Sequence, residues 1–140
     1  MGRGIAHVMA YAGFPVTLVD LKPRSPAAHL ALEQEARAEI TANLGTLQDA
    51  GIMGAADRTA ILERIRFAFG EEAETAMGSA DVLFEGVPEV MEYKQACLER
   101  VSALARTDAI IASTTSTFSA ETLAEFVDGP ERFLNAHWLN

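Results

Sequence analysis

The stretch "MGRGIAHVMAYAGFPVTLVDLK", residues 1–22, decides the fold of this chain. Residues 2–13 are mostly small and apolar, and Gly13 closes the run as a glycine closes a helix. Residues 16–20, "VTLVD", have the composition of a β-strand that ends on Asp20. A parallel α/β sheet needs a strand in front of its first helix. We therefore expect the first strand of the sheet to lie outside this numbering.

Helix-like and strand-like segments alternate along the rest of the chain. The expected helices cover residues 25–50, about 56–63, 71–78, about 89–105 and 119–126, with Pro88 at a first helical position and Ser119 as an N-cap. The expected strands are "RIRFAF", "DVLFEGV", "AIIAS" and "RFLNAHWLN", and the last one still runs at the chain end. This alternation predicts an α/β protein with a Rossmann-like, doubly wound parallel sheet, forming one partial domain over residues 1–140.

Composition restricts the function. The length of 140 residues suits one domain, and the net charge of −9 argues against nucleic acid as a partner, because phosphate binding needs a basic face. The single cysteine, Cys97, excludes an internal disulfide and lies in a helical pattern that predicts a buried thiol. Residues 4–19 lack charge but fall short of the roughly 20 apolar residues that span a bilayer. We expect a cytoplasmic protein with no membrane partner.

The opening stretch also fits part of a dinucleotide-binding fingerprint. Gly2 matches the third glycine, which lets a helix pack closely on a strand, and Asp20 matches the acid that binds the adenosine ribose. A carboxylate there repels a 2′-phosphate and favours NAD over NADP. On these two residues alone, a helix-packing glycine and a solvated turn aspartate explain the pattern equally well.

Three motifs, in order, resemble the L-3-hydroxyacyl-CoA dehydrogenase family. They are "MGRGIAHVMAYAGFPVTLVD" at residues 1–20, "ADVLFEGVPEVMEYKQACLERV" at 80–101 and "AIIASTTSTFSAETLAEFVDGPERFLNAHWLN" at 109–140. The last one matches a family pattern that ends in the catalytic H-[FPW]-x-N-P. Family members continue into an all-helical C-terminal domain that dimerises, so the chain resembles a piece of such an enzyme, clipped at both ends.

The resemblance implies a role for particular residues. His137 matches the catalytic base, and Ser116 matches the serine that binds the substrate oxygen. Glu89 and Lys94 match a pair on the nicotinamide-ribose side of the cofactor, although their spacing does not place them on one helical face. The implied cofactor is NAD, without a metal, and the implied partners are a small-molecule substrate and a second copy of the full-length enzyme. We expect the cofactor and substrate residues to line one cleft.

Several positions leave questions open. Glu85 ends a predicted strand and is a weaker candidate for the same region, and Asn140 has the place of a structural asparagine. Thr114 stands where the family has asparagine, so one hydroxyl replaces an amide. The family's glutamate that orients the histidine would follow Asn140. We therefore expect the chain by itself to have little or no dehydrogenase activity.

The substrate has alternatives. The leading interpretation is oxidation of the hydroxyl of a 3-hydroxyacyl-CoA, such as 3-hydroxybutyryl-CoA, in fatty acid metabolism. Relatives in the superfamily oxidise carnitine or sugar acids, and residues 25–50 contain a single arginine, Arg37, where acyl-CoA enzymes are often rich in lysine. Only Lys22 and Arg24 stand near it as further phosphate partners. A non-catalytic nucleotide-binding remnant is the third possibility.

Overall fold

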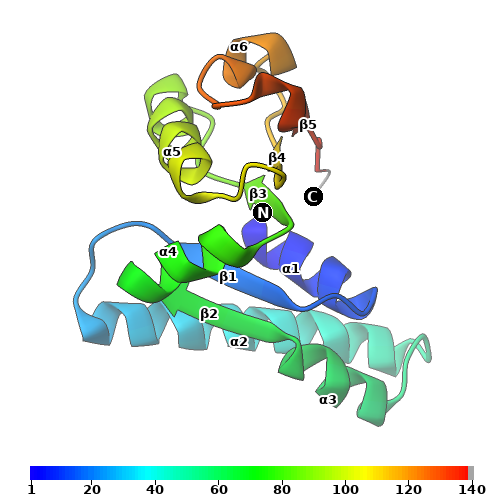
Figure 1. Cartoon of the computed structure of the whole chain (residues 1–140). Helices are drawn as coiled ribbons and strands as arrows, with labels where there is room; N and C mark the ends of the chain where they lie inside the picture. Colours follow the sequence, from blue (N-terminus) through cyan, green and yellow to red (C-terminus); the bar gives the residue numbers. More distant parts are fainter. Residues whose placement is uncertain (139–140) are drawn as a thin grey trace. The chain divides into compact units, whose positions relative to one another are not determined.

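A computed structural model describes residues 1–138, in which helices and strands alternate as the sequence predicts (Figure 1). The elements in chain order are α1 (Gly2–Tyr11), β1 (Val16–Asp20), α2 (Pro26–Asp49), α3 (Ala55–Glu63), β2 (Ile65–Phe69), α4 (Gly70–Ser79), β3 (Val82–Glu85), α5 (Met91–Leu104), β4 (Ile110–Ser113), α6 (Ala120–Ala124), a 3₁₀ turn (Pro130–Arg132) and β5 (Phe133–Asn135). They form two compact units: an N-terminal unit, Arg3–Ala73, and a C-terminal unit, Glu74–Asn140 together with Met1–Gly2.

All strand pairs found in residues 1–138 are parallel. β1 pairs with β2 in the N-terminal unit, and β3, β4 and β5 form a sheet in that order in the C-terminal unit. The order found within each sheet, β1–β2 and β3–β4–β5, agrees with part of the order of a doubly wound sheet. The predicted Rossmann-like fold class is confirmed.

The N-terminal unit packs helices on the β1–β2 pair. Gly13 has a φ of 98° and ends α1 in a left-handed turn, where its amide bonds Ala10 and the next amide bonds Met9. The side chain of Ser25 caps α2, which carries buried residues from its middle. The core of this unit joins α1, α2, α3 and β2 through Ala10, Ile40, Leu44, Met53, Ile61 and Ile65. The helices of this unit are therefore held against the β1–β2 pair by the burial of their apolar faces.

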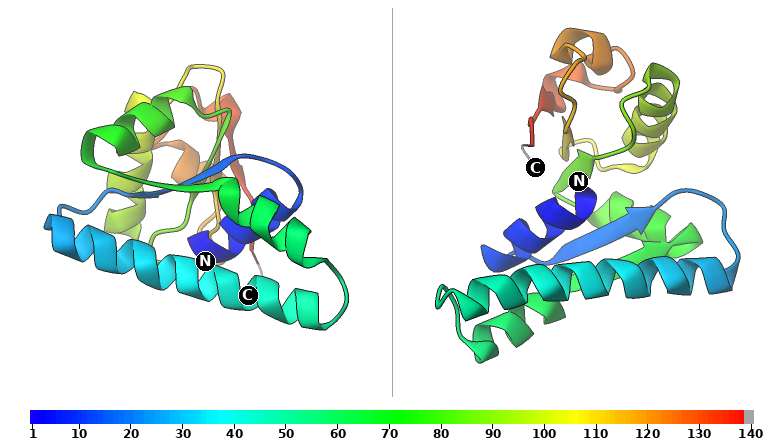
Figure 2. Two further views of the ribbon diagram at one scale, coloured as in Figure 1. Left: turned by 90° about the horizontal axis from the view of Figure 1, so that it is seen from below. Right: turned by 180° about the vertical axis from the view of Figure 1, so that it is seen from behind.

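The C-terminal unit is built on the β3–β4–β5 sheet, with α5 against β3 and α6 against β5 (Figures 1 and 2). Leu98 of α5, Ile111 of β4 and Leu123 of α6 are fully buried. Ser119 caps α6 as predicted, because its hydroxyl accepts a hydrogen bond from the Thr122 amide at 3.2 Å. The packing of α5 and α6 on the sheet therefore holds the ends of the three strands in place.

Two boundary predictions are wrong, and both errors lie beside the candidate site. The helix expected from Pro88 begins only at Met91, with Val90 as N-cap, because the Val90 amide bonds the Pro88 carbonyl at 2.7 Å in a tight turn centred on Glu89. The last strand is shorter than expected: β5 stops at Asn135. Its partner β4 ends at Ser113, opposite Asn135, so residues 136–138 lie past the end of β4.

The structure also bears on two further expectations, a buried Cys97 thiol and the lack of a membrane-spanning segment. Cys97 lies half-buried on α5 and has no disulfide partner in the described residues. Burial, and next the negative charge of Glu85, raise the pKa of the Cys97 thiol to about 11, so the group stays protonated near neutral pH. Within residues 1–138, none of the helices combines the length and apolarity required to cross a membrane.

Candidate functional site

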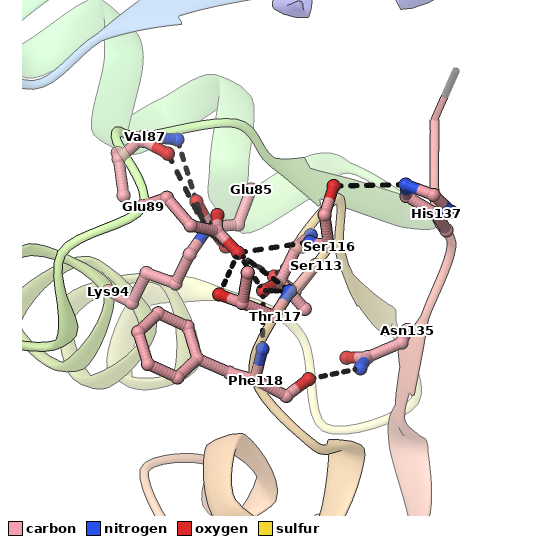
Figure 3. Close-up of polar contacts among 11 residues, drawn as sticks. Glu85, Val87, Glu89, Lys94, Ser113, Ser116, Thr117, Phe118, Asn135 and His137 are labelled. Carbon is pink, nitrogen blue, oxygen red and sulfur yellow. Dashed lines mark hydrogen bonds and ion pairs between the residues drawn. The ribbon is translucent and has the colours of Figure 1, made fainter.

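A buried acid–base pair joins the end of β3 to α5 (Figure 3). Glu85, the last residue of β3, is 3% exposed, and Lys94 of α5 is 0% exposed. The Lys94 ammonium lies 3.2 and 3.1 Å from the two carboxylate oxygens of Glu85. The same carboxylate accepts hydrogen bonds from the Ser113 hydroxyl at 2.5 Å and from the Val87 amide at 2.6 Å. A buried charge needs such compensation, and here the ion pair and two further donors supply it.

Glu89 connects this pair to the loop that follows β4. One carboxylate oxygen of Glu89 lies 3.2 Å from the Lys94 ammonium. The other accepts hydrogen bonds from the amides of Ser116 and Thr117 at 2.9 and 3.1 Å, and from the hydroxyls of Thr117 and Thr115. The carboxylate therefore closes a loop rich in hydroxyl groups against the start of α5.

These contacts hold Glu89 in its ionised form. Burial alone raises its pKa, but hydrogen bonds from Thr115, Thr117, Lys94 and the Ser116 amide outweigh it and lower the pKa of Glu89 to about 2. The side chain keeps 34% of its surface exposed. At neutral pH the loop thus rests on a fixed negative charge that solvent or a ligand can still reach.

The other side of the loop carries a serine–histidine pair. The Ser116 hydroxyl lies 2.9 Å from Nε2 of His137, and both residues are exposed (Figure 3). The segment with His137 is held by the Ala136 amide, which bonds the Ser113 carbonyl at 2.8 Å, and by the Asn135 side chain, which bonds the Phe118 carbonyl at 2.9 Å. A polar pair at the carboxyl ends of β4 and β5 is accessible to a small molecule.

Two predicted cofactor residues lie elsewhere in the fold. Asp20 ends β1 in the N-terminal unit, where its carboxylate accepts hydrogen bonds from the Arg24 side chain at 2.5 Å and the Lys22 amide at 3.2 Å. Gly2 belongs to the C-terminal unit. Gly2 lies beside Gly86, where an added Cβ would come 3.6 Å from the Gly2 amide nitrogen.

The structure thus brings together four of the six predicted site residues. Glu89, Lys94, Ser116 and His137 form one connected cluster, and Asp20 lies at the corresponding end of its own strand. That all of them line one cleft stays a prediction. The asparagine at position 140 lies outside the described residues.

Sequence reasoning missed the residues that connect this cluster. Ser113, Thr115 and Thr117 belong to the hydroxyl-rich "STTST", whose composition cannot show which hydroxyl points to a carboxylate. Thr114, the departure from the family pattern, is 1% exposed, and its amide bonds the Glu85 carbonyl at 3.0 Å. Glu85, which the sequence marked only as a weaker candidate for this region, is buried at the centre of these contacts.

Fold and site together define a class of protein. Parallel strands joined through helices place polar residues at their carboxyl ends, which is where α/β proteins bind nucleotides and substrates. The parallel strands and the polar residues at their carboxyl ends are typical of a nucleotide-binding α/β domain.

Comparison with known proteins identifies the family. Residues 1–140 match the family described as "3-hydroxyacyl-CoA dehydrogenase, NAD binding domain". The chain is 36% identical to the fatty acid oxidation complex subunit alpha of Psychrobacter arcticus and 34% identical to the 3-hydroxybutyryl-CoA dehydrogenase of Bradyrhizobium diazoefficiens, in each case over 100% of its own length. The crystal structure of (S)-3-hydroxybutyryl-CoA dehydrogenase from Ralstonia eutropha matches all of the chain with a TM-score of 0.87 at 28% identity.

The chain belongs to the 3-hydroxyacyl-CoA dehydrogenase family and corresponds to the NAD-binding domain of that family. It spans 18% of the Psychrobacter protein, 44% of the Bradyrhizobium protein and 46% of the Ralstonia structure. The fold and family predicted from the sequence are therefore confirmed, together with NAD as the family's cofactor.

Proposed function

We propose that this chain is the NAD-binding part of an enzyme that oxidises the hydroxyl group of a 3-hydroxyacyl-CoA to the corresponding ketone. The observation that carries the proposal is the Ser116–His137 pair, 2.9 Å between Oγ and Nε2, at the carboxyl ends of β4 and β5. Oxidation of a secondary alcohol requires a base for the hydroxyl proton and a donor for the oxygen. An exposed serine–histidine pair supplies both.

The residues present fit a dinucleotide. Asp20 offers a carboxylate at the end of β1 for ribose hydroxyls, and Gly2 stands at the N-terminus of α1, where backbone amides suit an anionic group. Glu89, held ionised and partly exposed, offers a second acceptor for hydroxyls. NAD, when bound, supplies the hydride acceptor.

The chain's own residues have separate tasks in this proposal. The imidazole of His137 accepts the hydroxyl proton of the substrate at Nε2. The Ser116 hydroxyl, bonded to the same nitrogen in the free protein, turns to the substrate oxygen and holds it next to the imidazole. Glu89 keeps the Ser116 amide fixed while the hydroxyl changes partner.

A smaller, non-CoA substrate is a second candidate, and the surroundings of α2 favour it. Arg37, the one arginine of α2, bonds Glu33 at 2.7 Å and lies over the Phe67 ring at 4.6 Å. Arg3, which approaches α2 from α1, pairs with Glu35 and Glu39. Both cations are engaged by the protein, so neither is available to a CoA phosphate without losing a partner.

Incubation of the chain with NAD and each alcohol tests the proposal. We expect NADH to form slowly from (S)-3-hydroxybutyryl-CoA, faster than from carnitine or a 3-hydroxy sugar acid, and to vanish in His137→Gln. A faster reaction with carnitine or the sugar acid would favour the second candidate. Calorimetry with NADH covers the case of an inactive chain: binding without turnover supports the domain assignment, and no binding contradicts it.

A further inference from the structure

We propose that Arg132 is a positioning residue: its guanidinium fixes the start of β5 on the end of α5, and β5 in turn holds His137 beside Ser116. The proposal rests on the proposed function only for what His137 does to a substrate. Arg132 ends the 3₁₀ turn that leads directly into β5. The contacts that carry the proposal all lie in the C-terminal unit.

The Arg132 guanidinium bonds three segments of the chain. Its Nη2 donates to the backbone carbonyl and to the hydroxyl of Ser102 in α5, each at 3.2 Å. Its Nη1 donates to the Arg106 carbonyl at 2.6 Å, in the loop between α5 and β4, and its Nε donates to the Asp128 carbonyl at 2.8 Å. A planar group with five donors in a fixed fork can bond several acceptors at once, whereas a point charge cannot. These contacts therefore define the position of Arg132 from several directions.

The turn before Arg132 is bound to the same place on α5. The Asp128 amide donates to the Ser102 hydroxyl at 2.7 Å, and Ser102 is 6% exposed. Gly129 has a φ of 76°, a left-handed conformation that suits glycine, and its carbonyl accepts a hydrogen bond from the Arg132 amide at 3.1 Å. The Ser102 hydroxyl thus accepts hydrogen bonds from both ends of this turn, and residues 128–132 are held on α5 together.

β5 depends on such support because it is short. It has three residues, and it pairs with β4 over Phe133, Leu134 and Asn135. A slip of one residue along β4 moves a strand by about 3.3 Å and turns each side chain to the opposite face of the sheet. Few ladder hydrogen bonds oppose such a slip here, so contacts outside the ladder decide where β5 begins.

The position of His137 follows from the register of β5. Directly after β5, the Ala136 amide bonds the Ser113 carbonyl at 2.8 Å, a contact that continues the observed pairing. His137 comes next, with its Nε2 2.9 Å from the Ser116 hydroxyl (Figure 3). A slip of about 3.3 Å is longer than this contact. Arg132 therefore acts on the serine–histidine pair through β5.

Amide hydrogen exchange separates a local effect on β5 from a loss of overall stability. In Arg132→Met we expect the Ala136 amide to exchange about tenfold faster or more, because β5 loses its support. The Thr114 amide, which bonds the Glu85 carbonyl of β3, should change by less than about twofold. Arg106→Met is the matched control: its guanidinium pairs with exposed carboxylates, and the carbonyl that Arg132 bonds remains. Unchanged exchange at Ala136, or an equal increase at both amides, would contradict the proposal.

The nitrogen chemical shift of the His137 ring supplies a second measurement that a purely stabilising role would not change. Ser116→Ala removes the hydroxyl partner of Nε2 and gives the shift of a ring without it. At the same pH, we expect the Nε2 shift in Arg132→Met to move towards the Ser116→Ala value and the shift in Arg106→Met to stay at that of wild type. A wild-type Nε2 shift in Arg132→Met would overturn the proposal.

Arg132→Lys covers a folding failure of the methionine variant. Lysine keeps the positive charge but lacks the planar fork, so we expect the same two changes in smaller size. If Arg132→Met does not fold, both measurements are made on Arg132→Lys, and wild-type values there would reject the positioning role, which depends on the fork. Neither measurement needs a ligand. A chain that neither binds NADH nor forms it would therefore count against the proposed function alone.

Discussion

The Glu85–Lys94 pair of the C-terminal unit and the Asp20–Arg24 pair of the N-terminal unit begin from the same element of structure. In each, a carboxylate ends a parallel strand and meets a basic side chain that follows it in sequence. They differ in exposure. Both side chains are 0% exposed in the first pair, whereas Arg24 and Asp20 are 34% and 18% exposed in the second.

That difference bears on stability. A buried ion pair depends on its partners, because each charge that loses its partner stays buried and uncompensated. An ion pair at the surface contributes little, because solvent can replace either partner. Equivalent positions at strand ends therefore differ in what they contribute to the fold.

The largest effect is expected in the buried pair. Lys94→Met leaves Glu85 as an uncompensated buried charge and should lower the free energy of unfolding by about 3–5 kcal/mol. Urea unfolding, followed by circular dichroism, measures the loss. The variant with both charges removed is the control, and it should recover most of the stability. A loss below about 1 kcal/mol would show that the pair behaves like an exposed one.

The next effect is expected at the exposed Asp20–Arg24 pair, where a substitution should change the affinity for NADH. Asp20→Asn removes the charge that we propose receives the ribose hydroxyls, and a hydrogen bond to a charged group contributes about 1.5–3 kcal/mol. We expect NADH to bind about tenfold more weakly or worse, and the preference for NADH over NADPH to shrink. Asp49→Asn, at the exposed end of α2 in the same unit, is the control. Unchanged NADH affinity would remove Asp20 from the site.

These contrasts show how far the sequence leads. The helices and the parallel strands follow from sequence periodicity and from the residues that end helices: Gly13 has a positive φ and ends a helix where a glycine was expected to do so. Gly2, Asp20, Glu89, Lys94, Ser116 and His137 followed from motifs whose roles the structure leaves as predictions. Local patterns therefore predict elements and candidate residues well.

What sequence could not predict depends on long-range contacts. α5 starts at Met91 because residues 88–90 form a tight turn. The side chain of Glu89 in this turn is bound by a loop more than 25 residues away, and no local preference encodes that contact. The burial of Lys94 likewise depends on an acid from another strand. A lysine on a helix is ordinarily exposed, so its sequence surroundings indicate solvent.

Acid pH should weaken the contacts between the Glu89 carboxylate and the loop that follows β4. The pKa of Glu89 lies at about 2 in the folded protein, below its ordinary value of 4.5, so its ionised form stabilises the fold. This contribution is complete above pH 4.5 and is lost as the pH falls from 4.5 towards 2. Because the side chain is one-third exposed, we expect about 1–2 kcal/mol after solvent screening.

Glu89→Gln supplies the comparison, because glutamine does not titrate. The difference in unfolding free energy between wild type and this variant should be greatest near neutral pH and should shrink to zero as the pH approaches 2. Urea unfolding at a series of pH values measures it. A difference that grows on acidification would mean that Glu89 is protonated in the folded protein, contrary to its hydrogen bonds with two amides.

The smallest effect is expected for Arg24→Met. The guanidinium bonds Asp20 at 2.5 Å, but it is one-third exposed and belongs to a loop, so its removal should change the free energy of unfolding by less than about 1 kcal/mol. NADH affinity should change less than in Asp20→Asn, since the carboxylate and the Lys22 amide that orients it remain. Urea unfolding and calorimetry on the same preparation give both values. A stability loss as large as that of Lys94→Met would mean that exposure does not separate the two pairs.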